Sequence, residues 1–212
     1  MNIDFNLPEG FLAIDLAPDP DRLRVLWEHA TGALTDDELQ SAAASFATMY
    51  VVLDELRSRQ TVHISVGIHP YGDDSFSRAL FTVSLRDSEI PDSSLALHAV
   101  RRVLDERPSM ETVTDIDLWK SGPAILMDGE HTPDPSLPDV KLRQSRLIVP
   151  FPDGDSRLAV MDMATPDLRS GDDYRDLLIL IGETLSFRET RQAAPEPPAP
   201  AAGPGLIASV LG

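Results

Sequence analysis

The sequence predicts an α+β protein: a mainly antiparallel sheet of about six to seven strands, with amphipathic helices packed on it and a flexible C-terminal tail. Runs of alternating apolar residues follow one another with short turn-rich connections, which favours antiparallel neighbours. Helical apolar spacing appears in four places without the regular strand–helix alternation of a doubly wound sheet. Hydrophobic residues make up 42% of the 212 residues, enough for one sizeable core.

The first half of the chain is predicted to form a strand, two helices and a hairpin. The strand covers 11–16, and the helices cover 20–32 and 35–57. The alternating runs 62–68 and 79–85 are expected to pair as a hairpin, with the histidine at position 63 on its polar face. Helix starts are indicated by an N-cap, a proline at the first helical position and a capping box: Asp19, Pro20, Thr35 and Glu38.

The second half is predicted to form a helix, a meander of four strands and a final helix. The first helix covers 94–106 and should bury Leu97, Val100, Val103 and Leu104. The last helix runs from about 172 to 186. Residues 128–138 hold three prolines and a glycine and are interpreted as a loop. The four predicted strands are 112–119, 123–127, 146–149 and 158–163. Packing roles are predicted for Trp119, Met161 and Met163.

The composition divides the chain into three parts. Residues 1–188 are expected to form a single acidic α+β domain. Residues 189–204 are rich in proline and alanine and read as a flexible linker without a core. Residues 205–212 form a short apolar peptide. An apolar peptide on a flexible tether can dock in a groove on another protein, so a partner-binding role is predicted for Leu206, Ile207, Ala208, Ser209, Val210 and Leu211.

The net charge of the chain limits the classes of molecule that it can be expected to bind. Acidic residues number 35 and basic residues 18, giving a formal net charge of −17. Such an excess repels phosphate, so we expect no binding to nucleic acid or to anionic membranes. The N-terminus lacks the basic and apolar regions of a secretory signal, and no apolar run approaches the length of a membrane span. We therefore expect a cytoplasmic protein. The sequence does not indicate its oligomeric state.

The residues that usually carry chemistry do not form a catalytic pattern. The chain has no cysteine, so disulfides, thiolate zinc sites and a cysteine nucleophile are excluded. Neither a Gly-x-Ser-x-Gly elbow nor a phosphate-binding glycine loop occurs. Asp115 and Asp117 share one face of a strand, which we interpret as a solvent-facing surface. His63 and His69 could form a metal pair, but surface or core histidines are the favoured interpretation.

The densest group of possible metal ligands lies in the predicted loop and is interpreted as a solvated turn, because the spacing of a calcium loop is absent. Its members are Asp128, Glu130, His131 and Asp134. We therefore predict a protein that is not an enzyme and that needs no metal or cofactor.

The two ends of the predicted domain resemble a known group of proteins. They read Pro-Glu-Gly-Phe-Leu-Ala-Ile-Asp-Leu at 8–16, and Leu-Ile-Val-Pro-Phe-Pro at 147–152, with Ala-Thr-Pro at 164–166 before the last helix. This is similar to uncharacterised actinobacterial (Streptomyces-type) cytoplasmic proteins of similar length, some of them associated with type VII secretion. Phe11 stands where that group usually has tryptophan, and Asp15 where it has proline. The resemblance implies a Mog1/PsbP-like fold, an accessory role and no catalytic residues.

The C-terminal peptide resembles the cargo-loading peptides of encapsulins, which often read Leu-Gly-Ile-Gly-Ser-Leu. The matching stretch is Ile-Ala-Ser-Val at 207–210, with alanine for glycine. We therefore predict a non-enzymatic interaction protein, such as an adaptor, chaperone or secretion accessory, whose C-terminal peptide docks on a partner. The alternatives are a cargo protein targeted to a shell by that peptide, an acidic immunity-type inhibitor of a basic toxin, and an enzyme using Asp128, Glu130 and His131.

Overall fold

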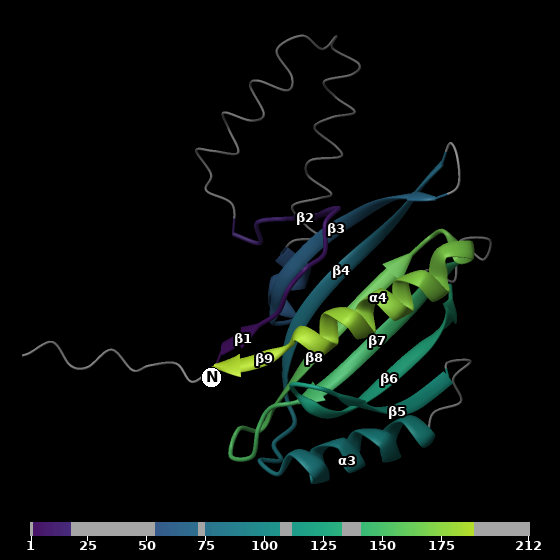
Figure 1. Cartoon of the computed structure of the whole chain (residues 1–212). Coiled ribbons are helices and arrows are strands. Elements are labelled where there is room, and N and C mark those ends of the chain that lie inside the picture. The colour runs from purple at the N-terminus through teal and green to yellow at the C-terminus, as the bar shows by residue number, and fades with distance from the viewer. Residues whose placement is uncertain (1, 18–53, 72–74, 107–111, 133–140, 189–212) are drawn as a thin grey trace, which may run out of the picture.

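The computed structural model describes residues 2–17, 54–71, 75–106, 112–132 and 141–188. Their main feature is a seven-stranded antiparallel sheet with the strand order β2-β3-β4-β8-β7-β6-β5 (Figure 1). A separate two-stranded sheet joins β1 to β9. The predicted α+β class with a mainly antiparallel sheet is thus confirmed.

Among the described residues, the predicted strands and the helices at 94–106 and 172–186 appear in the predicted order, and β1, η1 and β9 are elements that were not predicted. The N-terminal strands are β1 (Asn2–Asp4), β2 (Phe11–Ala13), β3 (Thr61–Tyr71) and β4 (Ser75–Asp87). The meander consists of β5 (Thr112–Leu118), β6 (Gly122–His131), β7 (Leu142–Pro150) and β8 (Arg157–Thr165), and β9 covers Ser186–Arg188. The helices are α3 (Ser93–Asp105), the 3-10 turn η1 (Leu168–Ser170) and α4 (Gly171–Thr184). The predicted helices at 20–32 and 35–57 lie outside the described residues, except for 54–57 within a helical stretch at 54–58.

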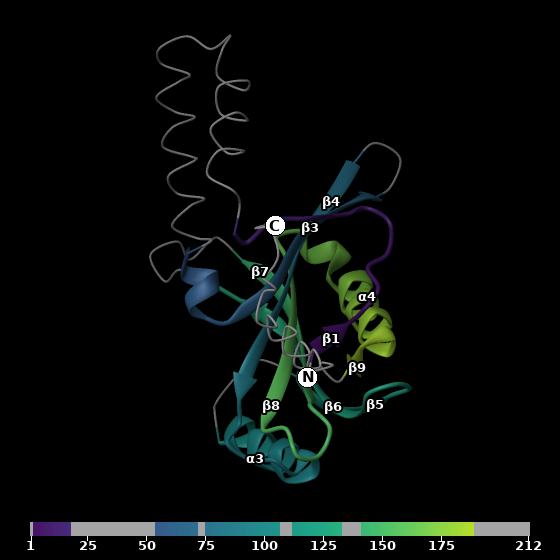
Figure 2. The same ribbon diagram turned by 90° about the vertical axis from the view of Figure 1, so that its left-hand side faces the viewer.

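The two described helices cover opposite faces of the sheet (Figures 1 and 2). Successive strand residues point to opposite faces, so neighbouring residues in β6 belong to different cores. Leu126 joins the core under α4, whereas Ile125 and Met127 join the core under α3. The sheet is therefore buried on both sides over its β6–β8 half.

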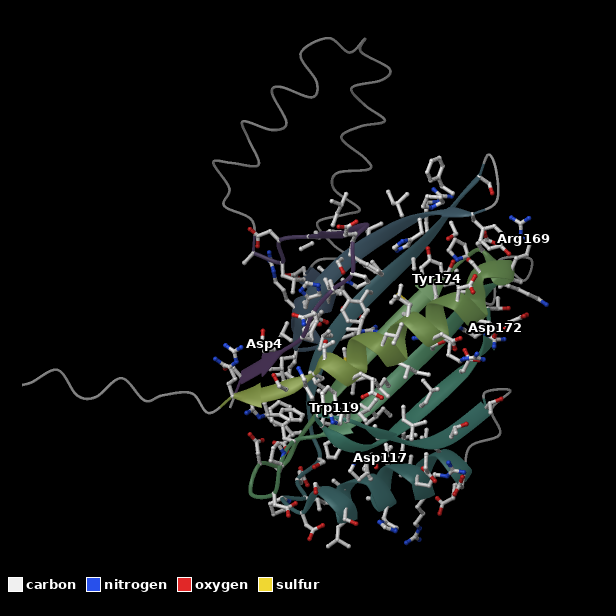
Figure 3. All side chains as sticks on the ribbon, in the orientation of Figure 1. Asp4, Asp117, Trp119, Arg169, Asp172 and Tyr174 are labelled. Carbon is white, nitrogen blue, oxygen red and sulfur yellow. The ribbon has the colours of Figure 1, made fainter. Side chains whose placement is uncertain are left out.

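The larger core lies between the sheet and α4. Helix α4 begins beside acidic residues in its first turn, which suit the positive end of the helix dipole. Gly182 lets the helix lie close to β7, because an added methyl group would overlap the Leu147 side chain. Tyr174 lies on α4 (Figure 3), and its hydroxyl oxygen is 2.8 Å from Ser77 Oγ on β4. The fully buried members are Phe81, Val83, Leu147, Val149, Phe151, Ala159, Met161, Leu178 and Leu185.

The N-terminal segment completes this core beside α4. Residues 3–11 run over the same face of the sheet, in front of β3 and β4 (Figure 1). Phe5 and Phe11 bring their rings within 5.7 Å and 6.2 Å of the Phe81 ring, centre to centre. At the far end of the segment, β1 pairs with β9 through Asn2↔Arg188, Ile3↔Phe187 and Asp4↔Ser186. The segment fastens the beginning of the described domain to its end.

The orientation of β3 differs from the prediction. Its histidines face the α4 core, and Ser65 on the same side is fully buried. Val62 and Ile68, on the other side, are 47% and 44% exposed. The histidine face is buried because residues 5–11 and α4 pack over it. In addition, a register shift between Thr61 and His63 changes the direction of the side chains at the start of the strand.

Three further predictions are wrong in detail. The predicted loop at 128–138 begins as strand, because β6 pairs with β7 as far as His131↔Leu142. Trp119 is 86% exposed rather than packed, and Val103 on α3 is 48% exposed rather than buried. The tight turn after β5 ends the strand at Leu118 and carries Trp119 out of the core. Met161 and Met163 face the core, as predicted.

The buried imidazole of His63 gives a pH-dependent prediction. It packs edge-on against the Phe5 ring at 5.2 Å, and burial lowers the pKa of His63 below its ordinary value near 6.5. Below about pH 6.5 the unfolded chain therefore takes up a proton that the folded protein resists, so folding stability falls as the pH falls through that range.

Melting temperatures at pH 7.5 and pH 5.0 should reveal this effect. The drop on acidification should be smaller for His63→Leu than for the unchanged protein. Equal drops in the two proteins would contradict the assignment to His63.

Candidate binding site

A pocket of about 460 Å³ opens at the β5 edge of the sheet, where the two cores approach each other. We call it the α3–β5 pocket. Its walls come from α3, from β5 and the start of β6, from the end of β7, and from β9. The volume falls in the range of pockets that hold small organic ligands, about 300–1,000 Å³.

The walls of the α3–β5 pocket are mainly apolar. They are formed by Leu97, Ile116, Pro123, Ile125, Phe151 and Phe187. The Phe151 and Phe187 rings lie 4.6 Å apart, and the Arg157 guanidinium lies 4.5 Å from the centre of the Phe151 ring. These contacts hold the Phe151 and Phe187 rings in place beside Arg157, the first residue of β8.

Basic side chains outnumber acidic ones in the pocket. Four lining residues are titratable: His98, Arg101, Asp115 and Lys120. Arg101 is held by three acceptors: its Nη1 donates to the Val113 carbonyl at 3.2 Å and lies 3.5 Å from Asp115 Oδ1, and its Nε donates to Asp105 at 3.1 Å. Asp115 thus has Arg101 as its ion-pair partner. Lys120 is the other cationic side chain in the lining of the pocket.

Lys120 and Ser121 form the turn between β5 and β6. Gly122 follows with a φ of +77°, which a residue with a side chain rarely adopts, so the glycine fixes the direction of the turn. The Trp119 amide donates to Glu183 Oε2 at 2.6 Å and anchors the turn to α4 (Figure 3). Within the described part of the chain, no carboxylate forms an ion pair with Lys120.

The hydroxyl of Ser121 is a buried polar group of the pocket lining. Its Oγ is buried and makes no hydrogen bond with any described residue. A buried hydroxyl without a partner is unfavourable by roughly 1–3 kcal/mol, so a bound group that accepts its proton would be stabilised. Ser121 and Lys120 are neighbours in the same turn, and both line the pocket.

The other chemistry-bearing residues differ in their partners. Among the described residues, His63 Nε2, His69 Nε2 and His131 Nδ1 are buried without a hydrogen-bond partner. Asp128 accepts hydrogen bonds from Arg143 and Ser145, which leaves it unsuited to a metal ion. Asp115 and Asp117 lie on the exposed side of β5, as predicted. Among the described residues, no group of three or more histidines and carboxylates is placed to hold a metal ion. Asp134 lies outside the described ranges.

A second apolar surface lies on the β2–β3–β4 side of the sheet, away from α4. Its exposed members are Leu12, Ile68, Phe76 and Leu80, with exposed fractions from 39% to 69%. The pairings Leu12↔Val66↔Leu80 and Pro70↔Phe76 place them on one face. Nothing among the described residues covers this surface.

The predicted docking residues, Leu206 to Leu211, lie outside the described ranges, as does the linker at 189–204. Sequence reasoning missed the α3–β5 pocket, because its lining comes from four separate segments. The one available signal was the Trp-Lys-Ser-Gly turn at 119–122 between two predicted strands. In the described helices, none is long and apolar enough to cross a membrane.

No protein-family model matches the chain, and no curated protein matches it in sequence. The resemblance of the domain to actinobacterial proteins with a Mog1/PsbP-like fold therefore stays a prediction. The class that the structure defines is an acidic α+β domain whose described residues form an apolar pocket, with basic side chains in its lining, at a sheet edge.

Proposed function

We propose that the protein is a non-enzymatic, cytoplasmic interaction protein whose apolar segment at 205–212 docks on another protein. The observation that carries the proposal is the closure of the domain by β9. Ser186–Arg188 pairs with Asn2–Asp4, and the described residues of both cores assemble with these two strands at the end of the domain. An apolar segment that follows such a domain on a proline- and alanine-rich tether can dock on a partner.

The intervening segment suits a tether. Residues 189–204 would span up to about 50 Å in an extended polyproline conformation, at about 3.1 Å per residue. The domain would then act as an acidic adaptor, chaperone or secretion accessory held near its partner. Because the chain leaves the described domain beside an exposed arginine, Arg188, the tether starts at the surface.

The test compares two charge-matched variants of the full chain. Ile207→Asp/Val210→Asp places two charges in the apolar segment, and Ala199→Asp/Ala202→Asp places the same charges in the linker. Each is expressed in an actinobacterial host, and co-purifying proteins are identified by mass spectrometry. We expect a partner with the unchanged and linker-variant chains that is lost with the segment variant.

The identity and behaviour of the partner separate the alternatives. Recovery of a shell-forming protein would assign the chain as cargo. A partner retained by the segment variant and released by moderate salt would place the interface on the acidic domain, as for an inhibitor of a basic toxin. Either the second result or the absence of any partner would overturn the proposed docking role of 205–212.

A further inference from the structure

We propose that the α3–β5 pocket binds a small amphipathic monoanion, a carboxylate with an apolar body of medium-chain length. The inference goes beyond the docking of residues 205–212 and does not depend on it. It rests on three features of the pocket: apolar walls, a lysine without an ion-pair partner among the described residues, and a buried hydroxyl without a hydrogen-bond partner there.

The apolar walls determine the body of the ligand. Aliphatic side chains from α3 and β6 face the aromatic pair Phe151 and Phe187 across the cavity. Burial of a hydrocarbon against such walls is favourable in proportion to the apolar area removed from water. A purely polar anion such as inorganic phosphate would gain nothing from these walls.

The charge of the ligand follows from the titratable groups in the pocket. Two cationic side chains line the pocket, Arg101 and Lys120. Arg101 is already occupied by Asp115, Asp105 and a backbone carbonyl. Lys120 forms no ion pair with a carboxylate of the described residues, so a single carboxylate on the ligand would supply its partner.

Lys120 and Ser121 specify a carboxylate better than another anion of the same charge. The lysine ammonium and the serine hydroxyl are both donors, and a carboxylate offers two acceptor oxygens that can receive one bond each. Ser121 Oγ is buried and lacks a partner among the described residues, so a bound carboxylate would supply the missing acceptor. An alcohol of the same length would not balance the lysine charge.

The test uses the full chain, with decanoate and decan-1-ol as probes below their aggregation concentrations. By calorimetric titration, decanoate should bind about tenfold or more tightly than the alcohol, because a charge-assisted hydrogen bond is about twice as strong as a neutral one. The chain has only two lysines, and Lys141 is exposed just before β7, at the opposite end of the β6–β7 pair from the pocket. Lys120→Glu should weaken decanoate about tenfold or more, whereas the charge-matched Lys141→Glu should leave the affinity unchanged.

Two readouts separate binding from a structural role. Ser121→Ala should weaken decanoate severalfold without lowering the melting temperature, because it removes a hydroxyl that has no partner in the free protein. Decanoate should also protect Lys120, but not Lys141, from an amine-acetylating reagent, as measured by peptide mass spectrometry. Equal affinities for decanoate and decanol, or equal effects of the two lysine variants, would overturn the proposal. Displacement of decanoate by a peptide of residues 205–212 would support the pocket as the binding site and would show that this peptide can bind there as well.

Discussion

Replacing Phe81 by alanine is expected to reduce the free energy of unfolding by about 3–5 kcal/mol, the largest effect of any single truncation considered for this fold. Phe81 is fully buried at the centre of the α4 core. Its ring meets the rings of Phe5 and Phe11 from the N-terminal segment and lies 5.7 Å from that of His63. The truncation would leave a cavity that the N-terminal segment and β3 must collapse to fill.

The matched control is on the same strand. Phe76 is 69% exposed on the opposite face of β4, so Phe76→Ala should change stability by no more than about 0.5 kcal/mol. Urea titrations followed by circular dichroism would compare the two variants with the unchanged chain. Similar losses for Phe76→Ala and Phe81→Ala would show that the assignment of β4 faces is wrong. Because domains are stable by only about 5–15 kcal/mol, Phe81→Ala should also lower the soluble yield.

Replacing Arg143 by alanine is expected to reduce stability by about 3 kcal/mol, the lower end of the range for breaking a buried ion pair. The Arg143 guanidinium makes two hydrogen bonds to the Asp128 carboxylate, one of them 3.1 Å long from Nε, and also reaches Asp172 at the start of α4. Asp128 is only 8% exposed. The lower value applies because the Arg143 side chain is 24% exposed, so water can reach the Asp128 charge once the arginine is gone.

Two further variants isolate the cause. Arg102→Ala on α3 breaks an exposed pair with Glu106 and should change stability by at most about 1 kcal/mol. Asp128→Leu/Arg143→Met removes both charges and should recover most of the loss, because no unpaired charge then stays buried. If the double variant is no more stable than Arg143→Ala in urea titrations, packing around the arginine, rather than the unpaired Asp128 charge, carries the effect.

Much of the fold could be predicted from local patterns. The alternation at 79–85 and 158–163 located β4 and β8, and the helical spacing at 172–186 located α4 with its buried residues. These patterns are strong because each of these segments packs one face against the α4 core. Strands β1 and β9 escaped prediction because three residues are too few to show a period. The two strands lie at opposite ends of the described chain, and Asn2 pairs with Arg188 and Asp4 with Ser186. The side chains of Asp4 and Arg188, which are 184 residues apart, also form an ion pair.

The orientation of β3 was beyond local patterns. Its aliphatic side chains alternate with His63, Ser65 and His69, which normally places the aliphatic set inside. In the structure the polar set is covered by aromatic rings from residues 5–11 and by Tyr174 from α4. Of the aliphatic set, Val62 and Ile68 are exposed, whereas Ile64 is buried. The same limit applies to the α3–β5 pocket, whose walls come from segments that only the tertiary fold brings together.

The order of the strands in the sheet has a consequence for translation. Strand β4, in the middle of the sheet, takes β8 as its second neighbour, although β5, β6 and β7 are made between them. On a growing chain the hairpin of β3 and β4 therefore waits with one open edge, and with Phe81 covered only by Phe5 and Phe11 of the N-terminal segment, until β8 and then α4 emerge. An unpaired, apolar strand edge is the usual starting point of aggregation. Ribosome-bound chains that stop between β4 and β8 should consequently be the species most in need of a chaperone.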